Sequence, residues 1–432
     1  MVREIIHLSV GQCGNQIGSA FWETIAREHG LDQSGHYSGI DTNQHEKIDV
    51  YFQEHQDSNY TPRAILVDQD PDIFNAVCSG YGQMFRQDNI LSGKYNAGGT
   101  WFTEWHDEDA KLVEQVLENV RREAENCDCF QGFQLTHSVA GGAGGGMGTI
   151  LLSKLREEYP DRMMATFSTM PSLKVSQGLV EPYNAVLAIS QLIENCDVVF
   201  CLDNEALYDI CTERLKIAQP AYANLNHLAS MVMSDISASF RFPGQRNSDL
   251  RKMAMNLVTI PRLHFLSVAY APLTNRQPDV GSSHKLTASG LIQQMFKPKN
   301  LMTACDVGNR HYLACSAIFR GRVPIQEIED HVRFIRDDNS ECSMERIPDN
   351  LQTSYCSQAT QGLDLSGTLI ENSTAIQHVF QRLSKEFTWL LCRKQYLFPY
   401  EMRGLYEFEF TEAVSNMDDL VLDYQLYNAQ SL

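Results

Sequence analysis

Ala140-Gly141-Gly142-Ala143-Gly144-Gly145-Gly146-Met147-Gly148 is the stretch that decides the fold. It follows an apolar run, Phe133–His137, that predicts a strand, and it precedes Thr149–Leu155, whose apolar residues have helical spacing. Glycines leave backbone N–H groups uncovered, and the dipole of a following helix favours an anion at that position. The stretch therefore predicts a phosphate-binding loop between a strand and a helix.

The spacing of these glycines excludes two common phosphate motifs. No Gly-Lys-Ser or Gly-Lys-Thr follows them, so the loop is not a Walker A motif, and Met147 stands where the last glycine of Gly-x-Gly-x-x-Gly would fall. No lysine or arginine lies between Phe133 and Leu152, so backbone dipoles and a metal would have to meet the phosphate charge. A flexible linker is the alternative, but linkers are rarely framed by a strand and an apolar helix.

Composition limits the partners that the chain can have. A length of 432 residues exceeds what one core usually supports, so two or more units are expected. The net charge of −19 argues against nucleic acid and anionic membranes as partners, and no window is apolar enough for a membrane span. The 12 cysteines are scattered without a paired Cys-x-x-Cys, which predicts a reduced, cytosolic protein without structural zinc.

Outward from the glycine-rich stretch, strands alternate with helices. A second loop, Gly11–Gln16, follows a predicted strand, Glu4–Val10, and precedes a helix that ends near Gly30. The series continues with strands at Ala64–Val67, Met163–Ser168 and Val198–Leu202 and helices at Asp107–Glu125, Glu181–Glu194 and Glu205–Leu215. Such alternation predicts a parallel sheet with helices on both faces, which binds ligands at the carboxyl ends of its strands. Both loops lie at such ends.

The second half of the chain has a different pattern. One long helix, Pro220–Phe242, is apolar nearly all round and is expected between two layers. Strands at His264–Tyr270 and Tyr312–Phe319 then mix with short helices, and Asn275–Lys285 is a polar loop expected to be mobile or to face a partner. Two helices, Thr374–Trp389 and Glu412–Tyr427, end the chain. We therefore expect an α/β fold with a parallel-sheet nucleotide-binding domain (1–203), a long central helix with a second mixed α/β domain (204–370), and a C-terminal helical hairpin (371–432).

Seven short motifs then identify a family. They are Gly11-Gln-Cys-Gly-Asn-Gln16, Gly132-Phe-Gln-Leu-Thr-His-Ser138, Val180-Glu-Pro-Tyr-Asn184, Leu202-Asp-Asn-Glu-Ala-Leu-Tyr-Asp-Ile210, Leu225-Asn-His-Leu228, Arg241-Phe-Pro-Gly-Gln245 and Phe410-Thr-Glu-Ala413. In this order and spacing they resemble tubulin, and in particular its beta subunit, over essentially the whole chain. The resemblance implies a cytoplasmic GTP-binding protein that pairs with alpha-tubulin and polymerises into microtubules, with lateral beta neighbours contacted through residues 275–285.

The resemblance also implies a nucleotide site, residue by residue. Gln12 and Cys13 would contact the phosphates and the base region, Ser138 and Gly142, Ala143 and Gly144 would hold phosphate, and Glu181 would approach the ribose. Asn204 and Asn226 would bond the guanine edge and Tyr222 would stack on the base, since an amide offers both a donor and an acceptor. Asp70 would help to hold Mg²⁺ beside the bound GTP or GDP. Alone, each residue has another reading: the asparagines as helix caps, and Tyr222 as a core residue.

The subunit type follows from Asp249-Leu250-Arg251-Lys252. In the family, alpha subunits place a glutamate on this helix, which activates water at the nucleotide of the neighbouring beta subunit. Lys252 stands where that acid would be, and a protonated ammonium has no acceptor with which to act as a base. The chain therefore resembles a beta type. The resemblance implies no catalytic residue in this chain, and the next alpha subunit would supply the acid.

Several positions depart from the beta pattern around the nucleotide. The family has Thr at Ala143, Gly at Ala140 and Ser at Gly145, so side-chain hydroxyls are lost while backbone donors remain. Asp70 replaces a longer Glu and Asp72 replaces a glycine. Residues 97–101 lack two asparagines, and Gln177 replaces an acid. These changes predict weakened rather than abolished GTP binding.

Two other functions stay open from the sequence. One is a non-polymerising tubulin-like protein, because Pro278, Asp279 and Gly281 differ from the usual lateral loop. The other is a nucleotide-dependent metabolic enzyme, which would need a base near the loops. His137 is the nearby candidate, and we interpret it as a structural histidine at a strand end.

Overall fold

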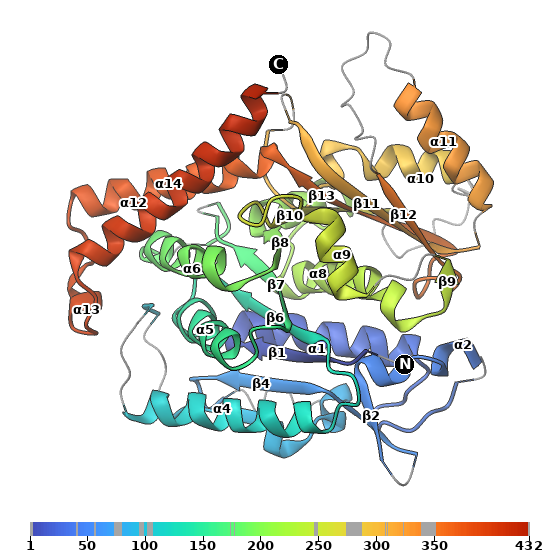
Figure 1. Cartoon of the computed structure of the whole chain (residues 1–432), viewed down its shortest axis with the longest axis horizontal. Coiled ribbons are helices and arrows are strands. Elements are labelled where there is room, and N and C mark those ends of the chain that lie inside the picture. Colours follow the sequence, from blue (N-terminus) through green and yellow to red (C-terminus); the bar gives the residue numbers. More distant parts are fainter. Residues whose placement is uncertain are drawn as a thin grey trace.

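The computed structural model describes residues 3–39, 42–55, 58–72, 80–94, 99–101, 107–172, 174–176, 178–245, 249–273, 287–306, 308, 310–322, 324–337 and 351–430. Within these residues eleven strands form one continuous sheet, in the order β5-β4-β1-β6-β7-β8-β10-β13-β11-β12-β9 (Figure 1). Its strands are β1 (Ile5–Val10), β4 (Ala64–Asp68), β5 (Ile90–Ser92), β6 (Gly132–Ser138), β7 (Met163–Met170), β8 (Val198–Asp203), β9 (Gly244–Gln245), β10 (Phe265–Ala271), β11 (Tyr312–Gly321), β12 (Gln352–Cys356) and β13 (Leu365–Ser373). A separate hairpin pairs β2 (Phe52–Glu54) with β3 (Tyr60–Pro62).

The half of the sheet from β5 to β10 is entirely parallel. Its strands are buried on both faces, as in β1, where Ile6, Leu8 and Val10 enter one hydrophobic cluster and Ile5 enters another. Both faces are buried even though β1 and β6 carry polar side chains at alternate positions, among them Ser9, Gln134 and Thr136, and these polar side chains are buried too. All their carboxyl ends meet at one edge of the sheet, which places the predicted ligand site there.

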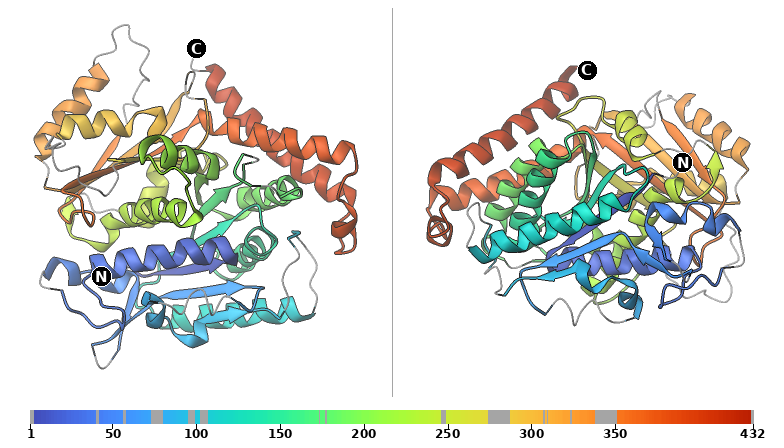
Figure 2. Two further views of the ribbon diagram at one scale, coloured as in Figure 1. Left: turned by 180° about the vertical axis from the view of Figure 1, so that it is seen from behind. Right: turned by 60° about the horizontal axis from the view of Figure 1, so that its bottom comes forward.

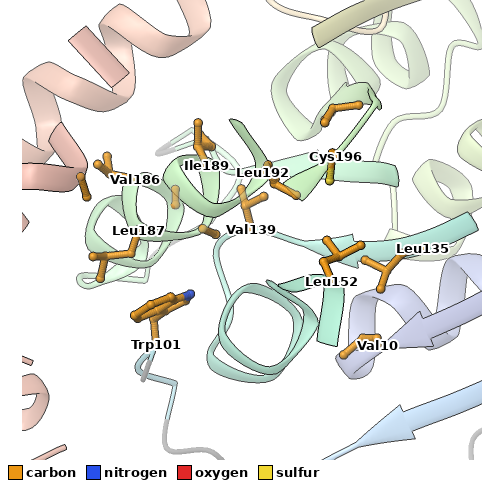
Figure 3. Close-up of a cluster of buried hydrophobic side chains, with 14 of the residues drawn as sticks. Val10, Trp101, Leu135, Val139, Leu152, Val186, Leu187, Ile189, Leu192 and Cys196 are labelled. Carbon is orange, nitrogen blue, oxygen red and sulfur yellow. The ribbon is translucent and has the colours of Figure 1, made fainter. Parts of the chain in front are cut away.

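Helices cover both faces of this parallel half. On one face lie α4 (Asp107–Glu125), α5 (Gly148–Glu158) and α6 (Glu181–Asn195), whose apolar side chains share a cluster with the strands. Figure 3 shows part of this cluster, with Leu152 of α5 next to Leu135 of β6, Val139 next to Leu192 of α6, and Trp101 near Leu187. On the other face α1 (Gly11–Glu28) packs against the long helix α8 (Tyr222–Arg241).

The other half of the sheet is mixed. β13 pairs antiparallel with both β10 and β11, while β11 and β12 run parallel. α10 (Ala288–Met295) and α11 (Ile325–Asp337) pack on one face in a third cluster. α8 and α9 (Leu250–Leu257) contact β11, so the long helix lies between the two halves.

The chain ends in a helical layer outside α6. α12 (Gln377–Cys392) and α14 (Glu407–Gln430) lie side by side, with the short α13 (Phe398–Glu401) between them in sequence (Figures 1 and 2). Both long helices contact α6. Two further α-helices among the residues that the structure describes are α2 (Thr42–His45) and α7 (Asn204–Asp209).

The predicted fold class is confirmed: a parallel sheet flanked by helices, a long central helix, a mixed second part and a C-terminal helical pair. The predicted boundaries at residues 203 and 370 stay predictions. Because β8 pairs with β10, the sheet continues across the predicted boundary at residue 203. The predicted helix Glu205–Leu215 is in fact α7 followed by a wide helical turn, Ile210–Arg214.

Both predicted loops proved to be helical. α1 begins at Gly11 directly after β1, so residues 11–16 are its first turns. The glycine-rich stretch forms a wide helical turn, η4 (Gly142–Met147), that leads without a break into α5. Glycine is a poor helix former, so these turns depend on tertiary contacts rather than on propensity. Among the described residues, no helix is long and apolar enough to cross a membrane.

Candidate functional site

Most of the predicted site residues come together at the carboxyl edge of the parallel strands. Gln12 and Cys13 lie in the first turn of α1 after β1, Asp70 follows β4, and Ser138 ends β6. Asn204 begins α7 directly after β8. Cys13 Sγ lies 3.9 Å from Thr169 Oγ1 of β7, which joins the start of α1 to a third strand end. Burial raises the pKa of Cys13 and keeps it a thiol.

The two glycine-bearing segments touch one another. Gly11 has a φ of +73°, and a Cβ there would lie 2.9 Å from the backbone nitrogen of Gly144. A Cβ on Gly144 would lie 2.7 Å from the carbonyl oxygen of Ser138. Glycine is therefore required at both positions, because the backbones of β1–α1 and η4 approach too closely for a side chain. The N–H groups of Gly142, Ala143 and Gly144 belong to the first turn of η4, where a helix has no intrahelical acceptors.

Buried side chains that the sequence analysis did not single out fix these segments. Asn15 Nδ2 donates to the carbonyl oxygens of Gly11 (2.9 Å) and Val67 (3.0 Å), and so ties the ends of β1 and β4 together. Asn184 and Trp101 bond the glycine-rich segment on its other side. A buried asparagine within a glycine motif is the sequence signal that would have found Asn15.

His137 has the structural role that the sequence predicted. Its Nδ1 lies 2.8 Å from the carbonyl oxygen of Gly144, which can only accept, so Nδ1 carries the proton. Nε2 therefore accepts from the hydroxyl of Ser168, also at 2.8 Å. Burial lowers the pKa of His137 to about 4, so the ring is neutral near pH 7. The histidine holds η4 on the sheet, and both ring nitrogens are occupied.

The residues assigned to the base lie at the starts of α7 and α8. Asn226 Nδ2 donates to Gln16 Oε1 of α1 at 3.1 Å, so the starts of α1 and α8 are bonded to each other. Tyr222 is the first residue of α8 and is 58% exposed, which leaves its ring face open for stacking rather than in the core. Asp203 caps α7 by accepting from the backbone nitrogen of Glu205 at 2.9 Å, and this orients Asn204 between them.

Glu181 offers a buried acceptor to a ligand. It begins α6, and its Oε1 accepts from the Ser176 hydroxyl. Its Oε2 is buried and has no hydrogen-bond partner among the described residues. Burial raises the pKa of Glu181, which a hydroxyl donor from a ligand would offset. A ribose hydroxyl fits this oxygen.

The turn after β4 carries acidic side chains, which is the ligand type that Mg²⁺ prefers. Asp68 is buried and its pKa is raised by that burial, and Asp70 follows two residues later. Asp68 Oδ1 accepts from the Asp70 backbone nitrogen (3.3 Å), and Asp70 Oδ1 accepts from that of Asp72 (3.0 Å), so the turn fixes Asp70 near the strand end. Mg²⁺ prefers one or two carboxylates together with water and phosphate oxygens. Among the described residues, no three acidic, histidine or cysteine side chains gather into a full protein cage.

Comparison with known families agrees with this geometry. The model of the Tubulin/FtsZ family GTPase domain matches residues 4–212, and that of the tubulin C-terminal domain matches residues 261–385. The chain belongs to the tubulin family. The GTPase-domain match covers these strand ends, and this tubulin-family protein is a GTP-binding protein.

The helix that carries Lys252 lies far from this edge. Arg3, which precedes β1, pairs with Asp249, the N-cap of α9. Arg251 Nη2 donates to the carbonyl oxygen of Asp161, which precedes β7, at 2.5 Å. Both contacts fall at the amino ends of the parallel strands. In this tubulin-family chain, exposed Lys252 and η4 are therefore at opposite edges of the sheet. Residues 97–98, Gln177 and 275–285, which the sequence analysis discussed, lie outside the described residues.

Proposed function

We propose that this protein is a beta-type tubulin. It binds GTP with Mg²⁺, pairs with alpha-tubulin, and polymerises into microtubules in the cytoplasm. Its GTP is hydrolysed on assembly, with the catalytic acid supplied by the next alpha subunit. Residues 275–285 are proposed to contact lateral beta neighbours.

The observation that carries the proposal is the position of α9 relative to η4. Because α9 lies at the amino edge and η4 at the carboxyl edge, a chain cannot bring its own α9 to its own nucleotide. A second subunit stacked on the carboxyl edge could bring its α9 there. An acid on that helix would then complete the site.

Lys252 supports the beta assignment within this arrangement. It lies in the first turn of α9, and its backbone nitrogen donates to Asp249 Oδ1 at 2.8 Å, while the side chain is exposed. An exposed ammonium at this place cannot accept a proton from water. The chain would therefore leave the nucleotide of the subunit it contacts intact.

Nucleotide binding uses the groups described above. The N–H groups of the first turn of η4 face phosphate, Asp70 binds Mg²⁺ directly or through water, and Glu181 Oε2 accepts from the ribose. Gln12, Cys13 and Ser138 complete the phosphate side, and Asn204, Asn226 and Tyr222 bind the base. When bound, Mg²⁺ supplies positive charge that the turn lacks.

Copolymerisation with a known alpha subunit, while GTP hydrolysis is followed, tests the proposal. The chain alone is expected to retain GTP without steady turnover, and hydrolysis is expected to accompany assembly. If the heterodimer is persistently absent from the microtubule pellet, the non-polymerising tubulin-like protein is the correct alternative. Steady GTPase activity of the chain alone would instead favour an independent enzyme.

Lys252→Glu sharpens the same experiment. The new carboxylate can act as a base, so hydrolysis of the nucleotide held by the alpha subunit in contact with α9 is expected to rise. Lys252→Gln is the matched control, because it removes the charge without adding a base, and it should leave that nucleotide intact. Nucleotides extracted from sedimented polymer would be separated and quantified. Equal GDP contents in the two variants would contradict the assigned role of this position.

A further inference from the structure

Asn184 of α6 joins three segments of the chain by four hydrogen bonds. Its Nδ2 donates to the carbonyl oxygens of Ala140 (2.7 Å) and Gly99 (2.8 Å). Its Oδ1 accepts from the backbone nitrogen of Trp101 (2.8 Å) and from the hydroxyl of Tyr400 (2.6 Å). A side-chain amide has two N–H donors and two acceptor lone pairs, so the group is saturated and its orientation is fixed.

These bonds bring residues 99–101 against the glycine-rich segment. Trp101 strengthens the contact, because its indole Nε1 donates to the carbonyl oxygen of Gly145 at 2.9 Å. The indole ring is buried next to α5 and α6 (Figure 3). Gly99, at the other end of the segment, is exposed. The two segments thus form one bonded unit beside the first turn of η4.

The C-terminal layer holds the same unit from outside. Tyr400 of α13 is fully buried, and its ring packs edge-on against those of Tyr183 (5.7 Å) and Phe410 (5.4 Å). Arg403, just after α13, donates from Nη1 to the carbonyl oxygen of Thr100 at 3.1 Å. Tyr400 and Arg403 are thus polar links from the C-terminal layer to residues 99–101 and Asn184.

We propose that Asn184 and Tyr400 are positioning residues for phosphate: they hold η4 and residues 99–101 at a fixed separation, so that phosphate recognition depends on the C-terminal helical layer. This inference rests on the nucleotide site assigned above. Loss of the Tyr400 hydroxyl leaves Asn184 Oδ1 with one donor in place of two. The amide can then shift, and with it both backbone segments beside the phosphates. Base recognition uses α7 and α8, which these bonds do not touch.

The test compares Tyr400→Phe with Tyr183→Phe in the full-length protein. The pair is matched, since both rings belong to one buried aromatic cluster and the Tyr183 hydroxyl also bonds a C-terminal carbonyl, that of Gln395 at 3.0 Å. Affinities for GMP, GDP and GTP with Mg²⁺ would be measured by competition against a fluorescent guanine nucleotide. Tyr400→Phe is expected to lower the ratio of GTP affinity to GMP affinity about fivefold to tenfold. Tyr183→Phe should leave this ratio unchanged.

A second variant and a second measurement guard against misfolding. Arg403 is partly exposed, and Arg403→Gln removes its hydrogen bond to the Thr100 carbonyl oxygen. This variant should also lower the ratio of GTP affinity to GMP affinity. In the wild type, GTP should slow hydrogen exchange at residues 398–405 more than GMP does. Equal weakening for all three nucleotides, or an unchanged ratio in both Tyr400→Phe and Arg403→Gln, overturns the inference and leaves the nucleotide site standing. A wild type that binds no guanine nucleotide overturns both.

Discussion

At the scale of the residue, Ala143 is the position where a small change should affect GTP affinity most directly. It is half-buried in the first turn of η4, where the tubulin resemblance expects a threonine. A hydrogen bond to a charged group contributes about 1.5–3 kcal/mol. Ala143→Thr is therefore expected to bind GTP about tenfold more tightly or better, as measured by titration calorimetry. Ala143→Val has the same shape without the hydroxyl, and an equal gain there would contradict this explanation.

A second prediction at this scale concerns pH and His137. Its folded-state pKa of about 4 is below the ordinary value of 6.5, so between these pH values the unfolded chain binds a proton that the folded chain refuses. The protonation of this residue therefore costs stability as pH falls from about 6.5 to about 4, by up to about 1.4 kcal/mol per pH unit, and costs nothing above that window. In urea titrations, His137→Gln should lose less stability than the wild type on acidification. Parallel stability curves for the two proteins would show that the buried ring does not titrate as described.

At the scale of the element, four buried charges join α1, α8 and β11. Glu28 of α1 pairs with Arg241 of α8 (2.8 Å) and Arg320 of β11 (3.0 Å), and Arg320 also pairs with Asp235 (2.8 Å). The pKa of Glu28 is lowered to about 2, because the attraction of the two guanidiniums outweighs the cost of burial. The helix that starts beside η4 is thus bonded at its other end to the second half of the sheet.

Glu28→Gln should therefore destabilise the protein strongly. The substitution removes one of the negative charges that neutralise the buried guanidiniums of Arg241 and Arg320. The loss of one partner of a buried ion pair typically lowers the free energy of unfolding by about 3–5 kcal/mol. Glu23→Gln is the control on the same helix, because its pair with Arg27 is exposed and should contribute less than about 1 kcal/mol. Urea unfolding of both variants provides the measurement. Similar losses in the two would mean that burial does not set the strength of this cluster.

The geometry of η4 gives a prediction for the phosphate turn. In Gly144→Ala the new methyl would meet the Ser138 carbonyl at 2.7 Å, so the turn must move and GTP affinity should fall about tenfold or more. A Cβ on Gly141, two residues before Ala143, meets nothing within 4 Å, and its φ is −91°. Gly141→Ala should therefore bind GTP like the wild type. The amount of nucleotide retained after gel filtration distinguishes the variants. If Gly144→Ala retains as much GTP as the wild type, that result contradicts the close approach of Gly144 to Ser138.

At the scale of the whole molecule, the continuous sheet predicts one unfolding transition. β8 of the nucleotide half pairs with β10 of the other half, and α8 lies between the halves. Calorimetric and van't Hoff enthalpies are expected to agree, and GTP at about 100 times its dissociation constant should stabilise the whole transition by about 2.7 kcal/mol. Two transitions, of which GTP moves only one, would show instead that the halves unfold separately.

The helices and strands could be predicted from the sequence more readily than the contacts between them. Apolar residues predicted β1 and β6, but the sequence did not show that the polar side chains between them, such as Ser9 and Thr136, are buried as well. Glycine-rich stretches read as loops, although η4 is helical, because the bonds from His137 and Trp101 that stabilise it come from other elements. Glu28 and Arg320 are far apart in sequence, so no local sequence pattern predicted that they form an ion pair. The nucleotide contacts themselves came from the family resemblance, and Asn184 stood in a quoted motif without an assigned role.

The opposed positions of η4 and α9 give the molecule a direction. A stack in which each copy or partner repeats the same edge-to-edge contact cannot close on itself by a two-fold axis, because the two edges are chemically different. One end of such a stack would always present nucleotide to the solvent, and the other would always present α9. Growth and loss of subunits at the two ends would then obey different rate constants.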